Sequence, residues 1–474
     1  MSAAPECNFS KTSVTFQSGK SLEISDARLQ IDGVDTLRLA QEHGTPLFVY
    51  SESRIRHNIE RLKKVQDAIA GPLKICYAAK AMSTLAILRV VKDAGIDIEV
   101  NSGGELWKAL KAGFAGDQII FNGTSKEIWE IELAIENGVY AIQVDSIYEL
   151  SLIKEAAERR GKRANVSLRL VPEIESATHS GLQTALLSSK FGMMPDEAFT
   201  AFRENTLSPH INLCGIHLHI GSQNPDPGVY TEALKVLFTA MRRISVESGI
   251  QLQHVNIGGG FPVDYLGGKD ADISDEQSEM LSANYEPYAA IGDAWRDAST
   301  QYEDLTENLT ILLEPGRSII ADAGICLTTV RNAKQRPTDN RQRTTDHWLL
   351  TDAGFNILLS METYKWYYHL ISAERAAEPH DTPYKLAGPL CDGGDVYFDL
   401  DGNRLPSHRL LPADVQPGEL LALLNCGAYS VSQASEYNGR FLPAIVLIRE
   451  DGRCELVRRR DTFEDLVASD LRSS

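Results

Sequence analysis

The sequence predicts an α/β fold: a (β/α)8 barrel joined to a mostly antiparallel β domain. Two observations in the 474-residue chain predict it. Between residues 46 and 320, short β-type runs alternate eight times with amphipathic helical segments, which is typical of a parallel barrel. After Ser318, β-type runs alternate with turn dipeptides such as Asp401-Gly402 and Asp451-Gly452, which favours an antiparallel sheet.

The barrel strands are expected where short apolar runs end in a polar or glycine-rich step. These runs are Ile75–Lys80, Ile96–Asn101, Ile119–Asn122, Ala141–Asp145, Val166–Val171, Ile216–Ile220, Val255–Gly258 and Ile311–Glu314. Between them, Ser146–Arg160 and Tyr230–Ser248 carry apolar residues three and four positions apart, the spacing of an amphipathic helix. We therefore expect the barrel domain to cover residues 46–318.

The β domain is expected to combine the two ends of the chain, residues 1–45 and 319–474, because both contain β-type runs. Its clearest predicted strands are Trp348–Thr351, Leu420–Leu424 and Ala444–Arg449. The polar and charged stretch Arg331–Thr345 is expected to be an exposed loop.

Composition excludes several classes of protein. With 47 basic and 65 acidic residues the chain carries a net charge of −18, which disfavours nucleic acid or an anionic membrane as the main partner. The seven cysteines are scattered without a CxxC pair, so neither a disulfide scaffold nor a structural zinc site is expected, and a cytoplasmic location is favoured. The sequence contains no apolar run of 18 residues and no signal-peptide pattern, so no membrane association is expected.

Polar side chains gather where the predicted barrel strands end, which is where barrel enzymes place their active sites. They are Lys80, Glu99, Asn101, Asn122, Asp145, Arg169, His217, His219, Glu314 and Arg317. A lysine in a partly desolvated pocket can form a Schiff base, although an isolated lysine at a strand end is usually solvated. Because so many other polar residues are expected at the same end of the barrel, a chemical role is favoured for Lys80.

Two further motifs fit a cofactor that carries a phosphate and a pyridine ring. Gly258, Gly259 and Gly260 follow a predicted strand, and their backbone N–H groups could hold a phosphate; the alternative is a tight turn. Glu314, in Glu314-Pro315-Gly316-Arg317, could keep the nitrogen of such a ring protonated, and Arg317 could bind a substrate carboxylate. A surface ion pair is the alternative for these two residues.

Histidine and cysteine complete the set of candidates. His217 and His219 lie on one face of a predicted strand, where they could stack on a flat ring, bind a metal with a third ligand, or sit as hydrogen-bonded core residues. Cys391, in the glycine-rich segment Gly388–Asp395, could donate a proton to a carbanion or could be a small buried residue. We expect no metal site.

Taken together, these motifs resemble the fold-type III decarboxylases that use pyridoxal 5'-phosphate, the family of diaminopimelate and ornithine decarboxylases. The resemblance extends from about Pro46 to Asp470, because six motifs occur in the family's order. They are Tyr77–Met82, His219–Gln223, Gly258–Pro262, Glu314–Ser318, Gly388–Asp395 and Gly427-Ala428-Tyr429. The fold that the resemblance implies, a barrel and a β domain as in alanine racemase and ornithine decarboxylase, agrees with the fold predicted from the pattern.

The resemblance implies a role for each candidate residue. Lys80 would hold the cofactor covalently, His219 would stack on its ring, and Glu314 would pair with the ring nitrogen. The phosphate would be held by Ser222, Gly258, Gly259, Gly260 and Tyr429. Arg317, Tyr364 and Asp392 would contact a small amino-acid substrate. Cys391 would come from the partner subunit of a head-to-tail homodimer and would protonate the carbanion that the loss of carbon dioxide leaves.

Departures from the family's pattern bear on the substrate. Ser360 stands where diaminopimelate decarboxylases have an arginine for the distal carboxylate, and Asp392 stands where they have glutamate. The segments Ser176–His179, Cys391–Asp395 and Arg459–Asp465 resemble the D-ornithine/D-lysine decarboxylase branch. This resemblance favours a D-configured diamino acid as substrate. Diaminopimelate, a citryl-diamine siderophore precursor, an amino-acid racemase activity and a non-catalytic regulator stay as alternatives.

Overall fold

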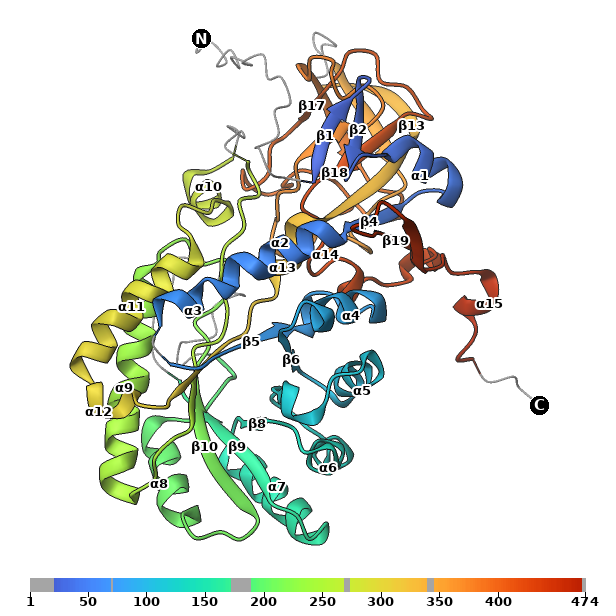
Figure 1. Cartoon of the computed structure of the whole chain (residues 1–474). Coiled ribbons are helices and arrows are strands. Elements are labelled where there is room, and N and C mark those ends of the chain that lie inside the picture. The colour runs from blue at the N-terminus through green and yellow to red at the C-terminus, as the bar shows by residue number, and fades with distance from the viewer. Residues whose placement is uncertain (1–20, 70, 172–188, 268–272, 339–344, 471–474) are drawn as a thin grey trace. The chain divides into compact units, whose positions relative to one another are not determined.

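The structure, a computed structural model, describes residues 21–69, 71–171, 189–267, 273–338 and 345–470 (Figure 1). The segment Ser176–His179 lies outside these residues. The chain divides into two compact units. The barrel unit comprises residues 55–264 and 279–320, and the sheet unit comprises residues 1–54, 265–278 and 321–474.

Eight parallel strands close the barrel unit in the order β10-β11-β12-β5-β6-β7-β8-β9. They are β5 (Leu73–Ala78), β6 (Asp97–Val100), β7 (Ile119–Phe121), β8 (Ala141–Val144), β9 (Ala164–Arg169), β10 (Ile211–His217), β11 (His254–Asn256) and β12 (Thr310–Leu313). Each overlaps an expected run, so the predicted barrel is confirmed; the largest shift is at β10, which begins five residues before the expected run and shares only Ile216 and His217 with it. The runs are apolar because strands of a parallel barrel are buried on both faces.

Helices follow the barrel strands in sequence, and two more, α2 and α3, precede the first of them. The longer ones are α2 (Glu52–Lys63), α4 (Leu85–Asp93), α5 (Gly103–Ala112), α6 (Ile128–Asn137), α7 (Ile147–Arg159), α8 (Pro195–Asn205), α9 (Gly228–Ser248) and α11 (Pro287–Gln301). The shorter ones are α3 (Val65–Ala68), α10 (Asp275–Leu281), α12 (Glu303–Thr306) and α13 (Arg317–Ile320). The predicted helices Ser146–Arg160 and Tyr230–Ser248 correspond to α7 and α9. In the described part of the chain, no helix is long and apolar enough to cross a membrane.

A serine and a glutamate three residues apart fix the turn before α7. Ser146 Oγ accepts a hydrogen bond from Glu149 N at 3.1 Å, and Glu149 Oε2 accepts one from Asp145 N at 2.7 Å. The first bond satisfies a backbone donor that the first helical turn leaves unpaired, and the second ties the residue before the cap to the helix. The other carboxylate oxygen of Glu149 accepts from the buried Lys126 Nζ at 2.6 Å. The end of β8 is thereby held to the helix that follows it.

The sheet unit contains a nine-stranded sheet with the path β17-β16-β14-β13-β4-β19-β20, and β18 and β15 pair beside it. The strands are β4 (Leu47–Ser51), β13 (Gly324–Pro337), β14 (Thr345–Thr351), β15 (Leu370–Ser372), β16 (Thr382–Ala387), β17 (Arg409–Leu411), β18 (Leu420–Leu423), β19 (Ala444–Ile448) and β20 (Cys454–Arg458). A separate small sheet holds β1 (Leu22–Ser25), β2 (Arg28–Ile31) and β3 (Val34–Asp35). The helices are α1 (Thr36–His43), α14 (Leu359–Thr363) and α15 (Phe463–Leu466).

Two features of this unit differ from what the sequence suggested. β4 joins the sheet between β13 and β19, although it precedes the barrel strands in the chain. The prediction of a loop over Arg331–Thr345 was wrong for residues 331–337, which continue β13 and pair with β14 as far as Pro337 opposite Thr345. Their side chains are exposed, but the backbone pairing does not depend on apolar side chains. Residues 339–344 lie outside the described part of the chain.

Candidate active site

Lys80 stands directly after β5, in the short 3-10 turn Ala79–Ala81. Its Nζ lies 3.9 Å from Glu99 Oε2, and Glu99 is fully buried in β6. Burial raises the pKa of Glu99, and the negative charge of Glu314 adds to this, while Lys80 opposes it; the net pKa is above the usual range. The lysine and the buried carboxyl group therefore form an ion pair at the end of β5 and β6.

Glu314, directly after β12, is the centre of a buried polar cluster. Its Oε1 accepts a hydrogen bond from Asn256 Nδ2 at 2.7 Å, and both of its oxygens accept from Asn122 Nδ2 at 3.1 Å. Its Oε2 lies 3.5 Å from His217 Nε2. Burial alone would raise the pKa of Glu314, but His217, Lys80 and Asn256 outweigh it and hold the pKa well below the usual range. Glu314 is thus a buried carboxylate that stays ionised.

The glycine segment after β11 lies too close to its neighbours to accept side chains. A Cβ on Gly259 would lie 2.2 Å from the backbone oxygen of Glu314, and one on Gly260 would lie 2.4 Å from Asn224 Nδ2. Gly258 and Gly260 also have φ values of 69° and 90°, in the left-handed region that favours glycine. Glycine is therefore required at this turn by space and by backbone conformation.

The N–H groups of this segment are partly used within the protein. Gly258 N donates to Asn256 Oδ1 at 2.9 Å, and Gly259 N donates to His219 Nδ1 at 3.2 Å. Within the described residues, the N–H of Gly260 has no hydrogen-bond partner. The segment therefore offers one such donor to a ligand, where the sequence suggested three. His219, for its part, accepts through Nδ1, and burial lowers its pKa well below the usual range, so its ring is neutral.

Arg317 and Ser222 come together on the same side of the barrel unit. Arg317 Nε and Nη2 each lie 3.4 Å from Ser222 Oγ, and the arginine is 7% exposed. Arg169, at the end of β9, is also buried, and its guanidinium lies 4.2 Å from the ring centroid of Phe191. Two arginines thus supply positive charge near the strand ends in a chain of net charge −18.

The remaining candidates belong to the sheet unit. Cys391 is exposed, and its N–H donates to Asn438 Oδ1 at 2.6 Å; Asp392 Oδ2 accepts from Tyr437 Oη at 3.3 Å. Tyr364 ends α14, and Tyr429 has a φ of 58°, in the left-handed region. Asp395 anchors the cysteine segment, because its carboxylate accepts from the N–H groups of Phe355 and Leu390 at 2.9 and 2.8 Å.

The residues of the barrel unit fit pyridoxal 5'-phosphate. The cofactor needs a lysine for its aldehyde, an anion beside its ring nitrogen, and donors for its phosphate. Lys80 supplies the first, and Glu314 supplies an ionised carboxylate that is held by the amides of Asn122 and Asn256 and lies beside His217. Ser222 and the Gly260 N–H supply hydroxyl and backbone donors. In the described part of the chain, no group of three or more histidine, cysteine, aspartate or glutamate side chains could hold a metal ion.

Asn256 was not identified from the sequence, although it makes the shortest hydrogen bond to Glu314. A signal was available: a single polar residue ends the strand His254–Asn256, two positions before the first glycine, so that its side chain points to the same face as that glycine. The sequence placed Asn122 and His217 at the strand ends but did not predict that they converge on Glu314.

Comparisons with known proteins agree with this geometry. The sequence profile of the pyridoxal binding domain of pyridoxal-dependent decarboxylases matches residues 54–321. The diaminopimelate decarboxylase of Methanocaldococcus jannaschii is 33% identical over 467 residues, which cover 97% of this chain and 98% of that protein. The diaminopimelate decarboxylase of Bacillus subtilis is 34% identical over 460 residues, covering 96% and 98%. A crystal structure of the M. jannaschii enzyme superposes with a TM-score of 0.82 over 96% of this chain and 98% of that one.

Proposed function

We propose a substrate for this chain on the premise that it belongs to the family of pyridoxal-dependent decarboxylases. It is an enzyme that uses pyridoxal 5'-phosphate to release a carboxylate as carbon dioxide, and its proposed substrate is diaminopimelate. The relatives named above carry that name and are similar to this chain over nearly its whole length. The preference for D-lysine or D-ornithine drawn from the sequence finds no support in these relatives.

The buried carboxylate of Glu314 is the observation that supports the chemistry most directly. When bound, the cofactor supplies an electron sink for the bonding pair that the departing carboxylate leaves behind. Because Glu314 stays ionised, it can hold a proton on the ring nitrogen and so maintain that sink. Asn122 and Asn256 fix the carboxylate of Glu314 by donating hydrogen bonds to it. Neither amide is a base that could take the proton from the ring nitrogen.

Lys80 and Cys391 are proposed to handle protons and the covalent attachment. Lys80 would hold the cofactor covalently, and Glu99, whose Oε2 lies 3.9 Å from Lys80 Nζ, would favour the protonated form of the free lysine. Cys391, exposed on a segment anchored by Asp395, would deliver a proton to the α-carbon after carbon dioxide leaves. Arg317, beside Ser222, would bind a substrate carboxylate.

We further propose a homodimer in which Cys391 of each subunit completes the site of the other. The test mixes two inactive variants, Lys80→Ala and Cys391→Ala, after mild dissociation and reassociation. If sites are shared, half of the dimers are mixed and each holds one intact site, so activity returns to about one quarter of the wild-type value. Failure to recover activity, with mixed dimers demonstrated by differently tagged subunits, would place Lys80 and Cys391 in sites of the same subunit.

One observation favours a second candidate, a diamino acid without a distal carboxylate. Ser360 lies in α14 where the family resemblance implies an arginine, and it is 4% exposed. A carboxylate desolvated without its cationic partner costs roughly 1–3 kcal/mol or more. If no other cation takes the arginine's place, the enzyme would prefer a substrate such as D-lysine or D-ornithine.

The substrate is tested by measuring carbon dioxide release from the cofactor-loaded enzyme with each amino acid separately. The panel contains meso-diaminopimelate, D-lysine, D-ornithine, their L-isomers and a citryl-diamine. We expect the highest kcat/KM for meso-diaminopimelate. A higher value for D-lysine or D-ornithine would overturn this proposal in favour of the second candidate, and release from the citryl-diamine alone would overturn both. The Lys80→Ala variant is the control for carbon dioxide that does not come from the site.

A further inference from the structure

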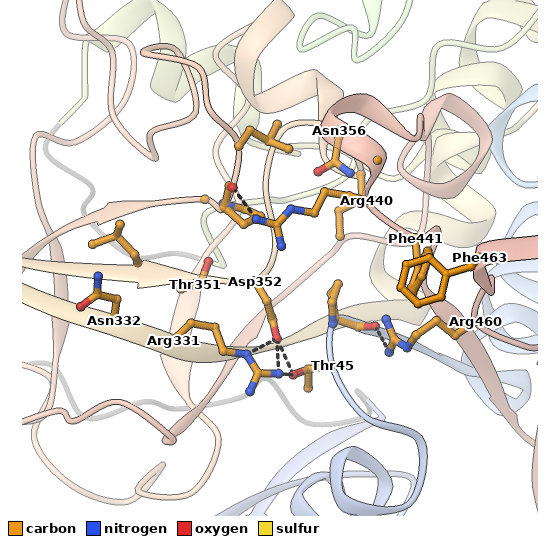
Figure 2. A pocket seen from close by; sticks show the side chains of 17 residues that line it. Thr45, Arg331, Asn332, Thr351, Asp352, Asn356, Arg440, Phe441, Arg460 and Phe463 are labelled. Atoms are coloured by element: carbon orange, nitrogen blue, oxygen red, sulfur yellow. Dashed lines mark hydrogen bonds and ion pairs between the residues drawn. The ribbon is translucent and has the colours of Figure 1, made fainter. Parts of the chain in front are cut away.

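A cavity of about 680 Å³ lies within the sheet unit, apart from every residue proposed above to bind cofactor or substrate. Its walls come from the middle of β13, from the end of β14 and the residues that follow it to 357, from the segment before β4, and from the segments around residues 388–390, 439–441 and 460–463 (Figure 2). All seventeen lining residues belong to one unit of the chain. The cavity is large enough for a small organic molecule.

The lining of this cavity is positively charged. It carries three guanidinium groups, Arg331, Arg440 and Arg460, against the single carboxylate of Asp352. Asp352 is already saturated: it accepts from Thr45 and Thr328 at 2.7 Å each and pairs with Arg331 at 2.7 Å. A net charge of plus two therefore remains in a protein whose overall charge is −18.

Two of the three arginines have no carboxylate partner among the described residues. Arg440 Nη2 donates to the carbonyl oxygen of Pro389 at 2.8 Å, and Arg460 Nη2 donates to that of Pro46 at 2.7 Å. Each guanidinium has five N–H donors, so donors are left over on both. Burial lowers the pKa of Arg460; Asp352 opposes this, while Arg331 and Arg458 add to it. A bound anion would compensate the charge of both arginines.

Aromatic surface lies next to this charge. The rings of Phe441 and Phe463 meet edge to face with centroids 5.1 Å apart, and Figure 2 shows them beside Arg460 at one side of the pocket. Phe463 is 75% exposed, which is unusual for a phenylalanine. An aromatic or apolar group that enters the pocket would cover this ring.

We propose that this cavity binds a small organic anion whose carboxylate or phosphate pairs with Arg440 and Arg460 and whose aromatic or apolar body packs on Phe441 and Phe463. The site is connected to the cysteine segment, because Arg440 also holds Pro389, two residues before Cys391. A ligand that engages Arg440 would therefore alter the position of Cys391 and change the rate of turnover. This second effect rests on the proposed role of Cys391, whereas binding itself does not.

The test measures binding of phenyl phosphate and benzoate to the cofactor-loaded enzyme by calorimetry, with inorganic phosphate and benzyl alcohol as partial probes. Arg440→Gln removes the charge but keeps an amide that can donate to Pro389. We expect it to weaken binding of phenyl phosphate by about tenfold or more, the effect of losing one charge-assisted contact. The matched control is Arg453→Gln, because Arg453 is 79% exposed and outside the cavity; its affinity should stay within about twofold of wild type.

A second variant keeps the test decisive if Arg440→Gln folds poorly. Phe463→Ala changes an exposed side chain, and we expect it to weaken phenyl phosphate but not inorganic phosphate. A phosphate that prefers the cofactor's own site would change the cofactor's absorbance and would respond to neither variant. The proposal is overturned if both variants bind phenyl phosphate as the wild type does, or if neither anion binds saturably below about 10 mM. Saturable binding without any change in turnover would confirm the anion site, and it would contradict only the proposed coupling of that site to Cys391.

Discussion

Replacing Gly259 with alanine should damage the cofactor site through the backbone. The new Cβ would lie 2.2 Å from the carbonyl oxygen of Glu314, and this atom cannot rotate away because it belongs to the main chain. Reaching even 3.0 Å requires a displacement of about 0.8 Å. The hydrogen bond from Glu314 N to Gly258 O, now 2.8 Å, joins the same two segments and would be stretched beyond hydrogen-bonding distance.

The cost follows from two contributions. Overpacking a well-packed site costs typically 1–3 kcal/mol, and the lost hydrogen bond adds roughly 1 kcal/mol. We therefore expect the free energy of unfolding of the cofactor-free protein to fall by about 2–4 kcal/mol. The same shift displaces Glu314 and releases His219 from the Gly259 N–H, so the affinity for pyridoxal 5'-phosphate should fall by about tenfold or more.

Urea unfolding followed by circular dichroism measures the first effect, and titration of the cofactor followed by absorbance measures the second. Gly104→Ala is the matched control: it lies in the same unit, in α5, and its new Cβ would have only Ser102 Oγ, at 3.7 Å, within 4 Å outside its chain neighbours and the helix backbone. Alanine there should leave cofactor affinity unchanged and stability equal or slightly higher. Wild-type cofactor affinity and stability in Gly259→Ala would refute the reasoning.

Three further predictions concern buried polar groups. Glu314→Gln should fold, because its amide can donate to His217 Nε2 while its oxygen accepts from Asn256, but kcat for carbon dioxide release should fall by on the order of 10² since the charge is lost; unchanged kcat would contradict this role. Burial lowers the pKa of His254 to about 3 in the folded protein, whereas the unfolded chain binds this proton at a pKa of about 6.5. The free energy of unfolding therefore falls as the pH drops from about 6.5 toward 3, because only the unfolded chain takes up the proton in that range. Between pH 7 and pH 5 the free energy of unfolding should fall by about 2 kcal/mol more in the wild type than in His254→Leu, which lacks the titrating group. Urea titrations at both pH values measure this, and equal decreases in the two proteins would refute it. Lys126→Met should cost about 3–5 kcal/mol, because Lys126 is buried and its loss leaves the Glu149 carboxylate unpaired, whereas Lys235→Met, at an exposed pair, should cost less than about 1 kcal/mol in the same assay.

The barrel was predictable from the sequence because its physics is local. A strand buried on both faces must be apolar, and a helix that covers it must be amphipathic, so each of the eight units carries its own signal. The place of β4 was not predictable in this way, because a buried apolar run fits a barrel strand and a sheet strand equally well. The continuation of β13 to Pro337 was missed for the opposite reason: its exposed polar side chains give no apolar signal.

The sequence predicted which residues belong to the candidate site, but not which of them contact one another. Lys80 and Glu314 were singled out because their residue types at strand ends suit one cofactor. The hydrogen bond from Asn256 to Glu314 crosses between the neighbouring strands β11 and β12. The one from Asn122 joins the end of β7 to the end of β12, and only closure of the barrel through β5 brings these two ends together. Likewise, no motif indicated the cavity lined by Arg440 and Arg460, because its charge comes from separate segments.

The position of β4 has a consequence for how the protein is made. Leu47 lies opposite Leu327 on one side and Ala444 on the other, so its partners follow it by 280 and 397 residues. At 5–20 residues per second, a ribosome needs roughly 20–80 s to deliver the second partner. Until β13 is made, the strand Leu47–Ser51, whose five residues are all buried in the finished protein, has neither partner, and until β19 is made it has only one. Nascent chains that pause during synthesis of the barrel should therefore expose this segment to chaperones and to self-association, and a barrel expressed alone should begin after Ser51.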